Sequence, residues 1–201
     1  MRLVVPFFKQ TTLFNCGPAA LKMVLSYFGK KVDIKELENK SKVKEGKAFF
    51  TIQIALASVL LGFKTEFYSK NISLNEENLE LDFYKKYTGE TSESLDIINF
   101  EAKKEGVKIE ERSFSINEFL NFLTEKSIPI VLLDWNVVAN REKRGYQGHF
   151  VPVIGYDKKN VYVHNQGFNN PQKFVKIPKE VFDKARKARG TDEDFLVIYK
   201  N

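Results

Sequence analysis

The chain has 201 residues, of which 43% are hydrophobic and 13% aromatic, so it can bury one substantial core without disulfides or a bound metal. Charged residues make up 29%, occur in both signs along the chain and leave a net charge of +6. This pattern excludes a disordered single-sign tail and shows no recognition motif for nucleic acid. We therefore expect one domain over residues 1–201 and no nucleic acid among its partners.

Cys16 is the single cysteine, which excludes an internal disulfide and any zinc site built from several cysteines. The N-terminal segment has only a short apolar run, broken by Pro6, with no small-residue cleavage site after it. The longest apolar stretch, 54–63, is far shorter than the roughly 20 residues that a spanning helix needs. These observations favour a cytoplasmic protein with no transmembrane segment.

The first half of the chain is predicted to be mainly helical. Asn15 can cap a helix over 16–28, which carries an apolar stripe and stops at Gly29. Further helix signals are 34–40, 52–61 with Thr51 as its cap, 95–105, and the Ser-x-x-Glu capping boxes Ser73 with Glu76 and Ser115 with Glu118. A strand is expected near 63–69, and the polar residues 70–106 suggest a surface insertion.

From residue 107 the apolar period changes to two and β-branched residues become frequent, which predicts a sheet. The expected strands are VKIEERS, PIVLLDW, HFVPVIGY, NVYVHN, KFVKI and FLVIYK. Residues 157–160 (DKKN) form a tight turn between HFVPVIGY and NVYVHN, so these two strands should be antiparallel neighbours. A last helix should start at Pro178. The pattern predicts an α+β fold with an N-terminal helical part and a C-terminal antiparallel sheet.

Cys16 stands at the start of the first predicted helix, where unpaired backbone N–H groups and the helix dipole lower the pKa of a thiol. A lone cysteine before an apolar helix is more often a small buried side chain than a nucleophile. The residues around Cys16 therefore decide between these two roles. The residues after it, 17–20 (GPAA), are small or rigid and let a substrate backbone approach. Gln10 precedes it by six residues, and its amide, with the Cys16 N–H, can serve the oxyanion of an acyl transfer.

A thiol nucleophile needs a base within hydrogen-bond reach, and His149 and His164 are the two histidines of the chain. His149 follows the Gly-rich loop end 145–148, where a side chain can face a cleft. His164 lies inside the apolar run NVYVHN. We therefore favour His149 as the general base.

The base in turn needs an acceptor that orients its second ring nitrogen. In a hairpin that turns at 157–160, His149 and Asn165 fall at the same end of neighbouring strands, whereas His164 faces the other side of the sheet. Asp157 is a competing acceptor, but it lies at the far end of the hairpin. Asn165 is therefore the expected partner of His149, and the loop 135–147 is a candidate cleft wall.

The order of Gln10, then Cys-Gly-Pro-Ala from Cys16, then His149-Phe, then a polar residue sixteen positions later resembles the bacteriocin-processing double-glycine leader peptidases. The resemblance covers about residues 4–30 and 145–167. It implies a papain-like cysteine peptidase fold, with Gln10 as oxyanion donor, Cys16 as nucleophile and His149 as base. The family usually has Asp where this chain has Asn165, and no ABC transporter domain is visible in this sequence.

The leading hypothesis is a stand-alone, leader-peptidase-like cysteine peptidase that cleaves a peptide or amide bond through a thioester on Cys16. A peptide or protein is the implied substrate, and no metal or organic cofactor is implied. Two alternatives remain open. The same site can act as an acyltransferase, or the chain can be a non-catalytic peptide-binding module.

Overall fold

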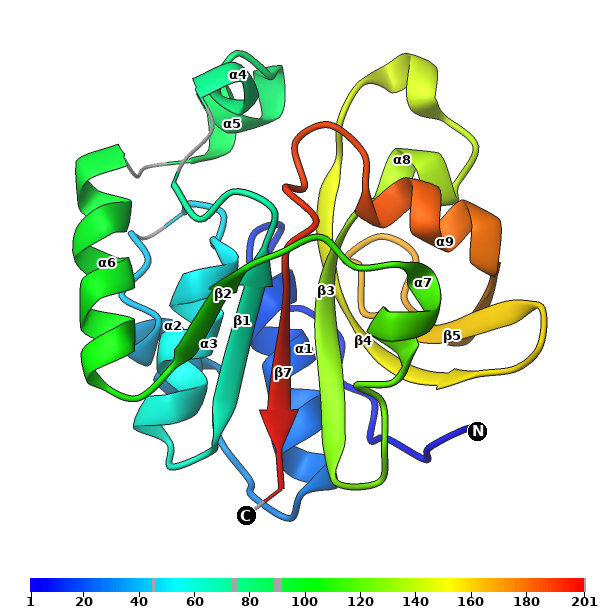
Figure 1. Ribbon diagram of the computed structural model, residues 1–201, viewed down its shortest axis with the longest axis horizontal. Coiled ribbons are helices and arrows are strands. Elements are labelled where there is room, and N and C mark those ends of the chain that lie inside the picture. Colours follow the sequence, from blue (N-terminus) through cyan, green and yellow to red (C-terminus); the bar gives the residue numbers. More distant parts are fainter. Residues whose placement is uncertain (45, 74–75, 89–91, 201) are drawn as a thin grey trace.

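The structure is a computed structural model that describes residues 1–44, 46–73, 76–88 and 92–200. Within these residues the fold is α+β, with a seven-stranded mixed sheet of order β2-β1-β7-β3-β4-β5-β6 (Figure 1). The strands are β1 (Thr65–Ser69), β2 (Lys108–Glu111), β3 (Ser127–Asp134), β4 (Gly148–Tyr156), β5 (Asn160–Asn165), β6 (Gln172–Pro178) and β7 (Phe195–Tyr199). β1 and β2 are parallel, and all other neighbours in the sheet are antiparallel.

Helices cover both faces of this sheet. They are α1 (Cys16–Tyr27), α2 (Ile34–Lys40), α3 (Thr51–Leu60), α4 (Glu76–Leu79), α5 (Asp82–Tyr87), α6 (Ser92–Lys104), α7 (Ile116–Leu120), α8 (Trp135–Val138) and α9 (Lys179–Arg186), with a 3₁₀ turn η1 (Glu142–Arg144). Figure 1 shows α1 and α3 behind the sheet and α7 and α9 in front of it. Among the described residues, no helix is both long and apolar enough to cross a membrane.

Close packing of α1 against α3 fixes the position of Cys16. The apolar residues of α1 from Ala19 to Leu25 are mostly buried, as their spacing along the helix predicts. Gly17 makes this approach possible, because a Cβ at this position would lie 2.4 Å from Cδ1 of Ile54 on α3. The first turn of α1 is therefore wedged between α3 and the sheet.

Most predicted elements are confirmed. The helices at 16–28, 34–40 and 95–105, the last helix and all six strands after residue 107 match within a few residues. Ser115 and Glu118 form the predicted capping box. The hairpin between β4 and β5 is closed by a backbone hydrogen bond from Asp157 to Asn160 of 2.9 Å. The box of Ser73 with Glu76 spans 74–75, outside the described residues.

The predicted cap at Thr51 is wrong, whereas Asn15 holds the predicted N-cap position of α1 but not the expected side-chain bond. The Asn15 side chain makes no cap hydrogen bond; its Oδ1 accepts from the N–H groups of Thr11 and Thr12, each at 3.0 Å, and so shapes the loop before α1. Thr51 is already inside α3 and donates to Asp194 at 2.7 Å. Hydrogen bonds within the preceding loop hold the Asn15 side chain, and a tertiary contact holds that of Thr51, so neither side chain caps its helix.

The predicted division into a helical first half and a separate sheet is also incomplete. β1, from the first half, lies inside the sheet between β2 and β7. Residues 70–106 are not a mere surface insertion, because Phe83, Tyr84 and Tyr87 of α5 line the main cavity of the described part of the chain. The segment therefore helps to build the site.

Candidate active site

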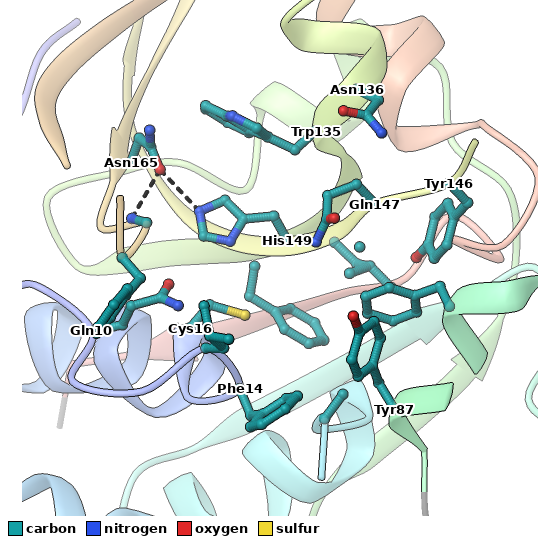
Figure 2. Close-up of a pocket in the computed structure, with 18 of the residues that line it drawn as sticks. Gln10, Phe14, Cys16, Tyr87, Trp135, Asn136, Tyr146, Gln147, His149 and Asn165 are labelled. Atoms are coloured by element: carbon teal, nitrogen blue, oxygen red, sulfur yellow. Dashed lines mark hydrogen bonds between the residues drawn. The ribbon is translucent and has the colours of Figure 1, made fainter. Parts of the chain in front are cut away.

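One cavity of about 760 Å³ brings together the four predicted site residues Gln10, Cys16, His149 and Asn165. Cys16 comes from the first turn of α1, His149 from the start of β4 and Asn165 from the end of β5. Figure 2 shows the Cys16 thiol below the His149 ring, with Asn165 on the far side of that ring. Residues far apart in the sequence thus meet at one edge of the β4–β5 hairpin.

The His149 ring is oriented by Asn165. Nε2 of His149 lies 3.0 Å from Oδ1 of Asn165. This oxygen also accepts the N–H of Gly167 at 2.9 Å, while Nδ2 of Asn165 donates to the carbonyl of Asn170 at 2.9 Å. With its amide fixed in this way, Asn165 presents an acceptor to the ring. Nε2 must therefore carry the proton, and Nδ1 keeps a free lone pair for a base.

Burial of the His149 side chain lowers its pKa to about 4, against a smaller opposing effect of the hydrogen bond to Asn165. Trp135 covers the ring edge-on, with ring centroids 5.1 Å apart. His149 is therefore neutral at pH 7, in the form that can accept a proton.

Burial also raises the pKa of the Cys16 thiol, although backbone hydrogen bonds at Phe150, Gly17 and Cys16 itself act in the opposite direction. The predicted lowering by the helix start is therefore wrong in sign, because desolvation outweighs it. Burial therefore favours the neutral form of both the Cys16 thiol and the His149 imidazole.

Cys16 and His149 are both described, and no direct hydrogen bond joins their side chains. Nδ1 of His149 points toward the side of the cavity where the Cys16 thiol lies (Figure 2). Catalytic hydrogen bonds are often long before substrate binds and tighten in the complex.

The Gln10 side chain is 7% exposed and turns its amide nitrogen toward Cys16 (Figure 2). Nε2 donates one hydrogen to the carbonyl of Thr12 at 2.8 Å, which leaves its second hydrogen for a ligand. The opposite orientation of the Gln10 amide is disfavoured, since it would set Oε1 against the carbonyl oxygen of Thr12. Gln10 is thus placed to donate to an oxyanion beside the thiol.

The two rejected candidates have structural roles instead. Nε2 of His164 lies 3.0 Å from the carbonyl of Val5, and its Nδ1 accepts the N–H of Phe174 at 3.2 Å, on the other side of β5. Asp157 accepts from the backbone N–H groups of Lys159 and Asn160, each at 2.8 Å. Both predictions from the hairpin geometry are confirmed.

Gln166 is a site residue that the sequence reasoning missed. Its side chain is fully buried, and Nε2 donates both to the carbonyl of Cys16, at 2.9 Å, and to that of Phe150. Its backbone carbonyl accepts the N–H of Gln10 at 3.1 Å. One residue therefore ties the start of α1, the strand that carries His149 and the segment that carries Gln10. Its position directly after Asn165 was the available signal.

Replacing Gln166 with Met is expected to lower hydrolytic kcat/KM on the order of 10- to 100-fold, because small displacements of reacting groups are costly. Loss of two buried hydrogen bonds also destabilises the fold, on the order of 2 kcal/mol. Gln53→Met is the matched control, since Gln53 is fully buried and accepts the backbone N–H of Phe50 but is not itself among the residues that line the cavity. Rates of Cys16 alkylation and unfolding midpoints, measured on both variants, separate positioning from stability. An equal fall in alkylation for both would contradict the positioning role.

The cavity wall opposite Asn165 is built from two segments. The loop 135–147 contributes Trp135 and Tyr146, as its composition predicts. Tyr146 packs against α5, with ring centroids 5.2 Å from Phe83 and 5.7 Å from Tyr84. These ring contacts fix the aromatic wall. Within the described residues, no group of three or more His, Cys, Asp or Glu side chains is arranged to hold a metal ion.

Sequence comparison identifies one family. A family model described as guanylylate cyclase matches residues 5–198. The protein named Guanylyl cyclase 1 of Arabidopsis thaliana is 25% identical over 207 residues, which cover 96% of this chain and 75% of that protein.

Structural comparison identifies a peptidase fold. A putative C39-like peptidase from Bacillus anthracis superposes with a TM-score of 0.62 at 16% identity, over 100% of this chain and 98% of that one. A double glycine motif protease from an AMS/PCAT transporter, solved with the leader peptide, gives a TM-score of 0.59 at 18% identity, over 100% of this chain and 94% of that one. The peptidase domain of Streptococcus ComA gives 0.53 at 16% identity, over 96% of each chain. The fold is therefore that of papain-like C39 peptidases.

Proposed function

The chain belongs to the guanylylate cyclase family, and we propose that this member is a cysteine peptidase that cleaves a peptide or amide bond through a thioester on Cys16. The observation that carries the proposal is the fixed tautomer of His149. Asn165 holds Nε2 at 3.0 Å, so the basic Nδ1 is turned to the cavity wall that carries the thiol. This is the relation that a nucleophile and its base require.

In the first step the Cys16 proton passes to Nδ1 of His149 while the sulfur attacks the substrate carbonyl carbon. The resulting oxyanion accepts hydrogen bonds from the Cys16 N–H and the second hydrogen of Gln10 Nε2. The carbon–nitrogen bond then breaks, and the amine leaves with the proton from Nδ1. Asn165 stabilises the imidazolium that exists between these events.

In the second step Nδ1 of His149 takes a proton from water, and the water oxygen attacks the thioester carbonyl. The carbon–sulfur bond breaks, the acid product leaves, and the Cys16 sulfur regains the proton. If an amine enters in place of water, the same steps give a new amide, so hydrolysis and acyl transfer use identical residues.

Cyclisation of GTP is a second candidate, favoured by the similarity along 96% of the chain to the Arabidopsis protein named Guanylyl cyclase 1. In that reaction His149 would take the proton of the ribose 3′-hydroxyl as its oxygen attacks the α-phosphorus and pyrophosphate leaves, while Cys16 would have no covalent role. The two candidates therefore differ in whether the thiol forms a bond to the substrate.

Product analysis tests the proposal directly. We expect a peptide library incubated with the protein to yield free acids and amines by mass spectrometry. A new amide that appears when glycinamide is added would identify a transferase instead. Parallel incubation with GTP and Mg²⁺ or Mn²⁺ provides the cyclase arm. Formation of cyclic GMP without any peptide cleavage would overturn the peptidase proposal.

A further inference from the structure

The charged side chains that line the cavity are of one sign. Arg141 and Arg144 contribute to its lining, and no Asp, Glu or Lys is found among the lining residues that the structure describes. His149 also lines it but is neutral at pH 7. The remaining wall is aromatic and polar. A substrate in this cavity therefore meets a positive field without a compensating carboxylate.

The two arginines stand on a well-anchored loop. The N–H of Arg141 donates to the carbonyl of Asn136 at 2.7 Å, and Nδ2 of Asn136 donates to the carbonyl of Gly145 at 2.8 Å. At the end of the loop the N–H of Gln147 donates to Asp134 Oδ1 at 3.1 Å. These hydrogen bonds anchor both ends of the loop, so the backbone that carries Arg141 and Arg144 is held in place.

The nearby carboxylates are engaged elsewhere. Glu142, which lies between the two arginines in sequence, pairs with Lys184 of α9 at 2.9 Å. Asp134 accepts the backbone N–H groups of Asn136 and Gln147. Across the described residues, neither Arg141 nor Arg144 forms an ion pair with a carboxylate. Both guanidinium groups are exposed at the cavity rim and keep their hydrogen-bond donors for a ligand.

We infer that the site selects substrates that carry an anionic group, with an acidic residue or free carboxylate of the peptide seated against Arg141 and Arg144. The inference rests on the proposed function, since it names the substrate class of the same site. The planar guanidinium matches a carboxylate in two-point geometry. The neighbouring rings of Tyr146 and Phe83 offer an apolar surface to the residue beside the acid.

Matched peptide pairs test this preference. A cleaved peptide with Glu near the scissile bond is compared with the same peptide carrying Gln. We expect the Glu/Gln ratio of kcat/KM to fall by about two- to fivefold in Arg141→Gln or Arg144→Gln and further in the double variant, as for other exposed charge pairs. Lys143→Gln is the control, because it removes the same charge from the same loop without altering the cavity lining. An equal fall in this control would overturn the assignment.

A second readout does not depend on turnover. Iodoacetate and iodoacetamide alkylate a thiol alike but differ in charge, so the ratio of their rates at Cys16 reports the field in the cavity. We expect the Arg141→Gln, Arg144→Gln double variant to lower the iodoacetate rate relative to iodoacetamide, and 0.5 M salt to lower it in the wild type. An unchanged ratio would overturn the anionic preference. A changed ratio without peptide cleavage would instead refute the peptidase function and leave the anion preference standing.

Discussion

Replacing Cys16 with Ala is expected to abolish peptide hydrolysis and covalent labelling by iodoacetamide together. The chain has one cysteine, so no other thiol can react in its place. Loss of a covalent nucleophile lowers kcat on the order of 10⁴-fold or more. Rates on a cleaved peptide, with intact mass after labelling, measure both effects on one sample.

The Cys16→Ala variant should keep its fold, which makes the loss interpretable. The side chain is only partly buried, and Ala fills the same helical position with a favourable propensity. The unfolding midpoint and far-UV circular dichroism serve as controls. Peptide hydrolysis that persists in a folded Cys16→Ala variant would refute the thioester mechanism. Cyclic GMP formation that is equal in both proteins would support the family's named activity instead.

Replacing His149 with Gln is expected to lower kcat/KM on the order of 10²- to 10⁴-fold, the usual contribution of a general base. In the wild type the base must be neutral, and its pKa is about 4, so activity should hold down to about pH 5 and fall through pH 4. Burial raises the pKa of Cys16, so the alkaline limb of the kcat/KM profile should lie above the pH at which a free thiol usually titrates. Rates from pH 3.5 to 10 measure both limbs.

Stability provides a separate check on the His149 pKa. The unfolded chain binds a proton at this residue below about pH 6.5, whereas the folded chain does so only near pH 4. Between these values the unfolded state holds more protons, so stability falls as pH falls from 6.5 to 4. The full effect is on the order of 3 kcal/mol. Urea unfolding of His149→Gln should show a correspondingly weaker pH dependence over this range, and an unaltered slope would contradict the buried neutral histidine.

Asn165→Asp gives a matched test of the orienting contact. Oδ1 of Asn165 lies 3.0 Å from Nε2 of His149, so a carboxylate in this place favours the imidazolium and raises the pKa of His149. The acid limb of kcat/KM should then move to higher pH, while the ring keeps its orientation. An acid limb that stays in place would assign that limb to another group.

The turn at 157–160 was predictable and places His149 and Asn165 at the same end of neighbouring strands. Side chains alternate between faces along β5, which separates Asn165 from His164. A bulge between Val153 and Gly155 then shifts the pairing from Tyr156 with Val161 to Val153 with Val163. This bulge sets the faces of His149 and Asn165 relative to each other and was not predicted from the sequence.

The protonation state of Cys16 was not predictable, because it depends on contacts from distant segments. The helix start argues for a lower thiol pKa, and backbone hydrogen bonds at Phe150, Gly17 and Cys16 act in that direction, but burial of the thiol in the folded chain outweighs them and raises the pKa. Gln166 was missed for a related reason. Its side chain joins Cys16 to Phe150, across a separation that no motif spacing encodes.

The aromatic wall from α5 was missed because residues 70–106 read as polar. Phe83, Tyr84 and Tyr87 belong to the short helix α5. The rings of Phe83 and Tyr84 pack against the ring of Tyr146. A short amphipathic helix within a polar segment gives a weak periodic signal. Its partner, the loop 135–147, comes much later in the chain.

The place of β7 has a consequence for how the protein is made. Phe195–Tyr199 is the last of the seven strands in sequence, yet it lies between β1 and β3 and bonds to both. Until this strand emerges from the ribosome, the β1–β2 pair and the β3–β6 strands have no continuous sheet to join them. The sheet therefore closes late in synthesis, and contacts of such high sequence separation form slowly. A nascent chain that ends before residue 195 is expected to emerge with the β1–β2 pair and the β3–β6 strands unjoined, while Gln166 already links the start of α1 to β4.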